Sequence, residues 1–330
     1  MKKLMISLVA LALLAGAVSS CAGVNASKHT TYYNENSKRM DAGVCVSKDY
    51  HISGNISKIH NPSMVNIIFT QSASTSVKGS IPEKLLPYLK VELSGGVLDI
   101  SVKEDKLPKH FRGFKYREEN YPTLYVTAKS LEKLNMEGTG DFKIKNGFSV
   151  SLKGLVVNSY GTGDFSIGGK LDAARGKVRF NLYGTGDLAL NNVDAQSNIF
   201  YVGVMGTGNA NINTLVCGEL KAEVSGTSDV NLKSFTGDKL NAIVCGTGDF
   251  NCNKINVNSC RASVTGTGDM RLSGNSVTVY LNVSGTGDIH ASELMAVDGE
   301  AIVSGSGSID CKVRNLDKRV SGSGDVKNRI

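Results

Sequence analysis

Gly138-Thr139-Gly140-Asp141 is the first of ten copies of a four-residue phrase that recurs, with small changes, to the end of the chain. Successive copies begin 17 to 23 residues apart, and most intervals are close to 20. Self-similarity at a period of this length is typical of a solenoid, in which each repeat forms one coil and stacks on the coil before it. The copies begin at Gly138, Gly161, Gly184, Gly206, Gly226, Gly246, Gly266, Gly285, Gly305 and Gly322.

Apolar residues occupy fixed positions around the copies, two and four residues before the first glycine and four and six residues after it. Around Gly266 these residues are Val264, Ala262, Met270 and Leu272, and the residues between them are mostly polar. Alternation with a period of two is typical of short strands with one buried face. Strands that keep the same inward positions in every repeat must lie parallel, and parallel crossovers are right-handed in about 98% of sheets.

The repeat therefore predicts an all-β fold, a right-handed single-stranded parallel β-helix of about ten coils over residues 131–330 with about 20 residues per coil. At a strand spacing of ~4.8 Å, ten coils give a rod about 48 Å long. Lys318 and Asn328 fall at apolar positions of the last coil, which indicates either fraying or a polar cap.

Residues 40–130 show strand-like alternation of their own, at 44–46, 51–56, 65–69, 89–93, 97–102 and 124–128. The pair Gly95-Gly96 indicates a hairpin between the fourth and fifth of these segments. We expect a β-rich N-terminal head over residues 40–130 that caps the helix and carries a charged insertion at 103–121.

The N-terminus has the pattern of a bacterial lipoprotein signal. Lys2 and Lys3 precede an apolar run over residues 4–18, and Val18-Ser19-Ser20-Cys21 follows as a small-residue cleavage site that ends in cysteine. The pattern predicts a signal peptide over residues 1–20, a lipid on Cys21 and a flexible tether over residues 21–39. The alternative is an ordinary secretory signal in which Cys21 has no role.

The charge balance limits the classes of partner that the sequence supports. Without residues 1–20 the chain has 35 Lys and Arg against 30 Asp and Glu, an excess of positive charge that is too small to indicate nucleic-acid binding.

Six cysteines follow Cys21, an even number that suits disulfides in an exported protein. The repeat argues against a disulfide ladder, because Cys252 and Cys311 share one inward position three coils apart. That separation is about 14 Å, whereas a disulfide needs Cα atoms within ~7 Å.

The aspartates of the phrase form a vertical file with two open interpretations. In the structural one, glycine supplies unusual backbone angles and aspartate folds its carboxylate onto N–H groups of the turn. In the other, the stacked carboxylates, ~5 Å apart and mutually repulsive, bind Ca²⁺ weakly. The file has Asn209 and Ser308 in two coils and otherwise consists of Asp141, Asp164, Asp187, Asp229, Asp249, Asp269, Asp288 and Asp325.

No coil shows the converging acids that polysaccharide hydrolysis or elimination requires, and the histidines have no metal-ligand spacing. We therefore expect no enzymatic activity, no catalytic residue and no cofactor. The insertion at 103–121, which mixes basic and aromatic residues, is a better candidate for binding an anionic glycan or a lipid headgroup. The alternative is a solvated loop. Its basic candidates are Lys109, Arg112, Lys115 and Arg117.

Two features together resemble a known family. One is the head pattern Ile67-Ile68-Phe69-Thr70-Gln71, followed by Ser76-Val77-Lys78-Gly79 and Gly96-Val97-Leu98-Asp99-Ile100. The other is the run of four-residue phrases, which we call corners, after Leu131-Glu132-Lys133-Leu134. Over residues 40–330 the chain resembles the family described as "putative auto-transporter adhesin, head GIN domain", found on exported proteins of bacteria with two membranes. The resemblance implies a right-handed β-helix in the cell envelope and brings no catalytic residue with it. Departures from the usual corner occur at Asn209, Ser228 and Ser308.

These observations lead us to expect a lipid-anchored, non-enzymatic β-solenoid of the bacterial cell envelope, held at the outer membrane. Its expected role is adhesion or scaffolding through a repetitive face, and the alternative is a surface protein that binds or processes polysaccharide. The expected partners are the membrane, through the lipid anchor, and a glycan or another envelope protein, but no nucleic acid.

Overall fold

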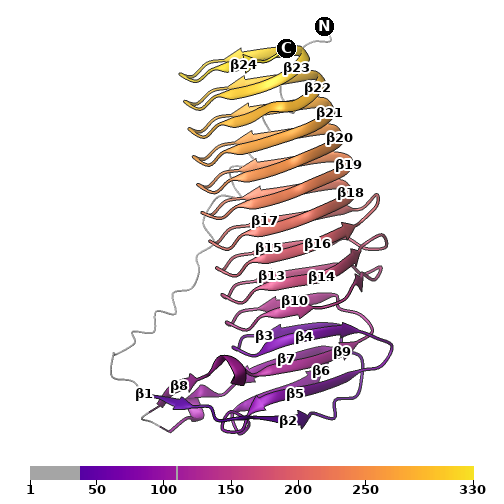
Figure 1. Ribbon diagram of the computed structural model, residues 1–330, viewed down its shortest axis with the longest axis vertical. Helices are drawn as coiled ribbons and strands as arrows, with labels where there is room; N and C mark the ends of the chain where they lie inside the picture. Colours follow the sequence, from indigo (N-terminus) through magenta and orange to yellow (C-terminus); the bar gives the residue numbers. More distant parts are fainter. Residues whose placement is uncertain (1–37, 109–110) are drawn as a thin grey trace. The chain divides into compact units, whose positions relative to one another are not determined.

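The computed structural model describes residues 38–108 and 111–330, which belong to one compact unit (Figure 1). Within these residues the regular secondary structure is strand, apart from two 3₁₀ turns, and the chain forms a β-solenoid, as predicted. The elements before the first repeat are β1 (Lys38–Asp41), β2 (Cys45–Asp49), β3 (Lys58–Asn61), β4 (Asn66–Gln71), β5 (Ser76–Pro82), β6 (Leu89–Ser94), β7 (Val97–Val102), the 3₁₀ turns η1 (Glu104–Lys106) and η2 (Glu118–Asn120), β8 (Phe111–Lys115) and β9 (Thr123–Ala128).

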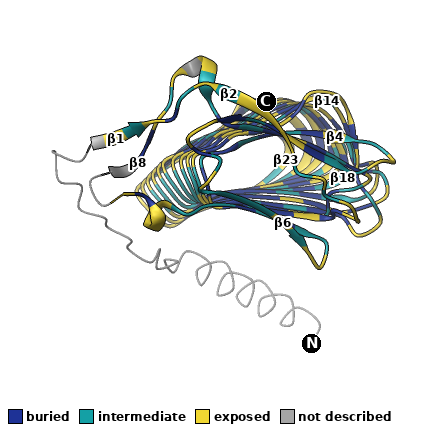
Figure 2. Ribbon diagram, turned by 90° about the horizontal axis from the view of Figure 1, so that it is seen from below, coloured by how far each residue is buried: buried dark blue, intermediate teal, exposed yellow. Residues whose placement is uncertain are grey.

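The strands of the repeats pair in parallel and in register. Ala242, for example, pairs with Ala222 in the preceding coil and with Ala262 in the next one. Figure 2 looks along this stack and shows the coils superposed. The strands are β10 (Lys133–Met136), β11 (Phe142–Ile144), β12 (Phe148–Ser149), β13 (Leu155–Ser159), β14 (Phe165–Asp172), β15 (Val178–Leu182), β16 (Leu188–Asp194), β17 (Ile199–Val204), β18 (Ala210–Val224), β19 (Val230–Val244), β20 (Phe250–Val264), β21 (Met270–Val283), β22 (Ile289–Val303), β23 (Ile309–Val320) and β24 (Val326–Asn328).

The stacking continues into the head. Strand β3 pairs in parallel with β10 and β7, and β4 pairs in parallel with β11 and β9, so head strands extend the stack beyond the first repeat. Strand β5 pairs antiparallel with both β9 and β2. A parallel stack thus changes to antiparallel pairing at its N-terminal end, where β2 and β5 lie in Figure 1.

Two expectations about the head have opposite outcomes. The hairpin is confirmed, because β6 and β7 pair antiparallel on either side of Gly95 and Gly96, whose φ angles of 56° and 79° favour glycine. The strand predicted over 51–56 is wrong, since no strand is present there. Positive φ angles at His51 (49°) and Gly54 (123°) turn the chain where alternation indicated an extended segment.

The predicted apolar positions form the core of the solenoid. All four positions are buried in the first nine coils, and some of their side chains stack along the axis, as Phe142 and Phe165 do with ring centroids 5.4 Å apart. In the last coil Lys318 and Asn328 are exposed. The Asn328 side chain accepts the N–H of Val313 at 2.9 Å and donates to its C=O at 2.8 Å. It thereby occupies backbone groups of the edge strand, which agrees with the predicted polar cap.

The first glycine of each corner is required by space, not by backbone angle, which corrects the expectation. None of the ten has a φ in the left-handed region. A Cβ atom at Gly266 would lie well inside 3.0 Å of the carbonyl oxygen of Gly246 in the preceding coil, and the same overlap recurs from coil to coil. The second glycine is equally crowded, although Ser228 replaces it in one coil and buries a hydroxyl that has no partner among the described residues.

We expect Gly266→Ala to destabilise the protein by about 3 kcal/mol or more, because the overlapping atoms belong to the backbone and cannot rotate away. Thr267→Ala, one residue further along the same corner, removes an exposed side chain and should cost less than about 0.5 kcal/mol. Urea unfolding followed by circular dichroism measures both changes. Equal losses in the two variants would contradict the requirement for space.

Four cysteines of the solenoid behave as core residues. Cys217, Cys252, Cys260 and Cys311 are buried free thiols, as predicted for Cys252 and Cys311. Burial raises the pKa of the first three thiols to about 12 and that of Cys311 to about 11. A thiol reacts as its thiolate, so both burial and the raised pKa protect these side chains.

Thiol titration tests this arrangement. In the folded chain carrying Cys21→Ser, at most the half-buried Cys45 and Cys245 should react with a soluble aromatic disulfide reagent at mildly alkaline pH, whereas all six thiols should react after unfolding in urea. A Thr267→Cys variant, with its thiol at an exposed corner position, provides the reactive control. Reaction of three or more native thiols in the parent chain would place one of the four core cysteines at the surface.

Candidate functional site

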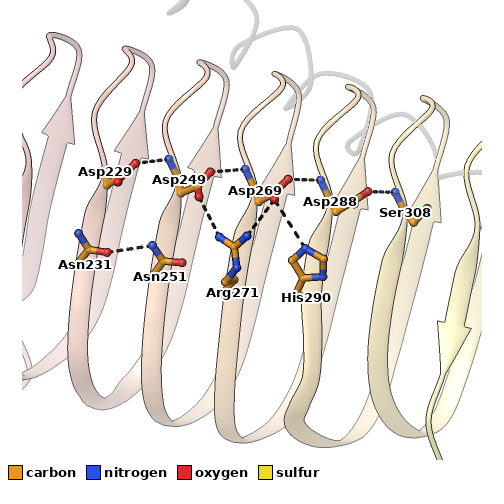
Figure 3. A network of polar contacts seen from close by, with 9 residues as sticks. All are labelled: Asp229, Asn231, Asp249, Asn251, Asp269, Arg271, Asp288, His290 and Ser308. Carbon is orange, nitrogen blue, oxygen red and sulfur yellow. Dashed lines mark hydrogen bonds and ion pairs between the residues drawn. The ribbon is translucent and has the colours of Figure 1, made fainter.

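Backbone amides of neighbouring coils hold the file of corner aspartates, which we call the ladder. One carboxylate oxygen of each member accepts the N–H of the equivalent residue in the next coil; Asp249 Oδ1, for example, accepts from Asp269 at 2.8 Å (Figure 3). The series starts at Asn66 in the head and ends at the N–H of Ser308. Its nine hydrogen bonds are between 2.6 and 3.0 Å long.

These bonds explain the ladder structurally, with one correction. The carboxylates bond to the next coil and not to their own turn; Asp325, in the last coil, differs and accepts the N–H of Val326 at 2.7 Å. Asn209 serves as well as an acid does, because its side-chain oxygen accepts the N–H of Asp229 at 2.8 Å. The position therefore needs an oxygen acceptor, and a bound cation is not needed to hold it. Weak Ca²⁺ binding by the ladder stays a prediction.

One segment of the ladder combines acids with a histidine. Asp269, Asp288 and His290 offer ligand atoms that lie within 4.8 Å of one another. Arg271 lies beside them, and its guanidinium donates to Asp249 at 2.9 Å and to Asp269 at 3.2 Å (Figure 3). This guanidinium reduces the repulsion between the two carboxylates and competes with a cation for Asp269.

The basic insertion lies in the head, away from the ladder. Strand β8 pairs in parallel with β1 to form a two-stranded sheet. Lys115 and Arg117 are exposed at its end, and Arg117 lies 3.9 Å from Asp41. Lys109 and the side chain of Arg112 fall outside the described residues, and whether the insertion binds a ligand stays a prediction.

Cys21, predicted to carry a lipid, also falls outside the described residues, together with the signal peptide and most of the tether. Among the residues that the structure describes, no helix is long and apolar enough to cross a bilayer.

A groove that the sequence did not reveal runs along the solenoid axis. It has a volume of about 660 Å³, and three consecutive residues from each of five coils line most of it. Register pairing links these coils in order, since Val216, Thr236, Asn256, Asn275 and Met295 occupy the same position in successive coils. At ~4.8 Å per coil, this lining is about 20 Å long. Its segments are 216–218, 236–238, 256–258, 275–277 and 295–297.

The groove is apolar with amides along it. Val216, Val277, Met295 and Val297 are each 38% to 53% exposed, which makes the groove the main cluster of exposed apolar side chains on the described surface. The side-chain amides of Asn256 and Asn275 make no hydrogen bond to any described residue. Val277 faces this groove, whereas Val279, two residues further on, is buried.

A file of mostly small residues forms the floor of the groove. Cys217, Gly237, Val257, Ser276 and Ala296 follow one another in the middle of the five segments, and all except Gly237 are buried. Aligning the repeats on this position would have revealed the file, but its members differ too much in residue type to form an evident motif.

A pair of substitutions separates an acceptor role from a charge role in the ladder. Asp229→Ala should cost about 1–2 kcal/mol, because the N–H of Asp249, 2.9 Å from Asp229 Oδ1, loses its acceptor. Asp229→Asn should cost less than half as much, as Asn209 already fills the neighbouring position. Urea unfolding with and without millimolar Ca²⁺ measures both variants. A large loss for Asp229→Asn that appears only with Ca²⁺ would support the cation interpretation instead.

Comparisons with known proteins found a matching family and several similar solved structures. The family described as "Putative auto-transporter adhesin, head GIN domain" matches residues 55–251 and 231–329. Similar solved structures include a "putative adhesin" from Parabacteroides distasonis (18% identity, 88% of this chain and 100% of that chain, TM-score 0.47) and a "putative adhesin" from Parabacteroides merdae (16%, 88% and 98%, 0.49). A "putative lipid binding protein" from Parabacteroides distasonis is also similar (19%, 89% and 100%, 0.47).

A comparison with curated proteins gave no match. The family match extends over most of residues 55–329, well beyond half of the chain. The chain therefore belongs to the family described as "Putative auto-transporter adhesin, head GIN domain".

Proposed function

We propose that the chain is a lipid-anchored adhesin of the bacterial cell envelope, held at the outer membrane through Cys21, and that it binds its ligand in the axial groove. The groove is the observation that carries this proposal. It has a volume of about 660 Å³, and exposed apolar side chains concentrate in it. Exposed apolar clusters of this kind are typical of binding surfaces.

The form of the groove suits an extended ligand. It is shallow, and it crosses several coils instead of closing around one point. The lining positions of successive coils pair in parallel, so their side chains are already spaced along the axis and binding requires little ordering of the protein. A flexible polymer that lies along the axis can contact the same kind of position in coil after coil.

The lining argues for binding without turnover. Asp238 is the one acidic residue among those that line the groove, and its carboxylate accepts a hydrogen bond from Asn258 at 2.8 Å. Glycoside hydrolysis needs two carboxyl groups in different environments. The ladder has many acids, but from Asp141 to Asp288 one oxygen of each carboxylate accepts a backbone N–H of the next coil. We therefore propose a non-enzymatic role.

A polysaccharide is the second candidate that the geometry favours, as the ligand of the same groove. Sugar rings present C–H faces to apolar side chains and hydroxyl groups to amides. The groove offers both, with Val277 and Met295 as apolar contacts and the amides of Asn256 and Asn275 as hydrogen-bonding groups.

Removing the groove contacts tests the proposal. The triple variant Asn256→Ala, Asn275→Ala and Met295→Ala should weaken binding to a panel of immobilised polysaccharides, or adhesion of cells to a host surface, at least tenfold. Its stability should change little, because these side chains are exposed. The matched control is Asn146→Ala, Asn253→Ala and Val320→Ala, at exposed positions outside the groove. Equal adhesion by parent and groove variant would refute this site.

The lipid anchor is tested separately. Cells that express the chain should incorporate labelled fatty acid into it, and Cys21→Ser should abolish this label and release the protein from the membrane fraction. Label that persists in the Cys21→Ser variant would refute the proposed anchor.

A further inference from the structure

The two parts of the described chain differ in charge. Residues 38–130 contain 14 Lys and Arg against nine Asp and Glu, whereas residues 131–330 contain 20 of each. The solenoid is therefore neutral, and the positive charge of the folded part belongs to the head. Charge that is segregated in this way acts on a partner of opposite sign only through the end that carries it.

Much of the charge of the head gathers at the sheet of β1 and β8. Arg39, Lys84, Lys115 and Arg117 have exposed side chains in this region. The backbone brings them together, since the N–H of Ala42 donates to the C=O of Lys115 at 3.1 Å and the N–H of Lys84 donates to the C=O of Ala42 at 3.2 Å. We call these four basic residues the head cluster.

Acidic residues only partly compensate the positive charge of the head. Asp41 lies 3.9 Å from Arg117. In the sequence, Glu83 is next to Lys84, and Glu118 and Glu119 follow Arg117. A hydrogen bond from the N–H of Gly43 lowers the pKa of the Asp41 carboxyl, and the positive charges of Arg117, Lys84 and Lys115 lower it further. Three cations thus act on the Asp41 carboxylate, and residues 38–130 as a whole keep an excess of five basic over acidic residues, 14 against nine.

The position of the head cluster fits the proposed anchor. Strand β1 starts at Lys38, so only the 16 residues 22–37 separate the cluster strand from Cys21. Sixteen residues span at most ~55 Å when fully extended. Strand β1 lies at the end of the stack opposite to β24 (Figure 1). A lipid on Cys21 therefore allows the basic end to reach the bilayer, and the neutral solenoid has no comparable attraction to it.

Resting on the lipid anchor of the proposed function, we infer that the head cluster binds the phosphates of anionic phospholipids in the membrane that holds the anchor. This contact places the head against the bilayer and directs the C-terminal coils and the axial groove away from it. The attraction acts over about one Debye length, ~8 Å at physiological ionic strength, so it requires close approach of the head and weakens when salt is added.

Vesicle binding by the non-acylated chain tests the inference. Residues 21–330 with Cys21→Ser should sediment with phosphatidylcholine vesicles that contain phosphatidylglycerol, but not with pure phosphatidylcholine vesicles, and high salt should release the protein. Each basic residue near an anionic surface contributes up to about fivefold. The variant Arg39→Gln, Lys84→Gln, Lys115→Gln, Arg117→Gln should therefore bind at least tenfold more weakly. The control Lys143→Gln, Lys145→Gln, Lys233→Gln, Lys239→Gln removes the same charge from exposed solenoid positions and should bind within twofold of the parent.

Three results would overturn the inference: no preference of the parent for anionic vesicles, equal losses in the head and solenoid variants, or full competition by a soluble anionic polysaccharide. The last would assign the cluster to a glycan. The assay is independent of acylation and of the groove. Failure of fatty-acid labelling at Cys21 would thus remove the anchor while vesicle binding still reported on the head, and groove variants should bind vesicles like the parent.

Discussion

The fold depends on how closely successive corners approach one another. At the first position of the corner, the carbonyl oxygen of one coil occupies the space that a Cβ atom of the next would need, so glycine recurs there in all ten repeats. This contact lets each aspartate side chain reach the N–H of the next coil. Inside the corner, the same stacking brings equivalent apolar side chains together and creates a core that one coil alone could not form. The close contact between corner backbones, the aspartate ladder and the apolar core therefore all depend on the same spacing between coils.

The repeats could be predicted in detail because every constraint on them is periodic. A residue such as Ala242 meets its equivalents Ala222 and Ala262, so the sequence of one coil describes the surroundings of all. Two features of the corner differ from the expectation for one reason, namely the steric role of glycine and the bonding of each aspartate to the next coil. Both depend on contacts between coils, in which the position of an atom in the neighbouring coil matters more than local backbone preference.

The head was predictable only in part, because its pairings are remote and do not repeat. Strand β3 pairs with β10 although 71 residues separate Asn61 from Lys133. Asn66 takes the place of the corner aspartate without the phrase that marks the other corners. The groove could not be predicted from the sequence, because it depends on the size of the side chains at one position. The residues of its floor are mostly small but differ in type, so they form no recognisable motif.

Asn328 affects whether the last strands of the solenoid can pair with another copy of the chain. A solenoid that ends in a bare strand offers a free template on which an identical molecule could add. The amide of Asn328 already satisfies both backbone groups of Val313, while exposed Lys318 and Arg319 repel the same edge of an approaching copy. One small side chain thus helps to block pairing between the edges of two copies of this chain.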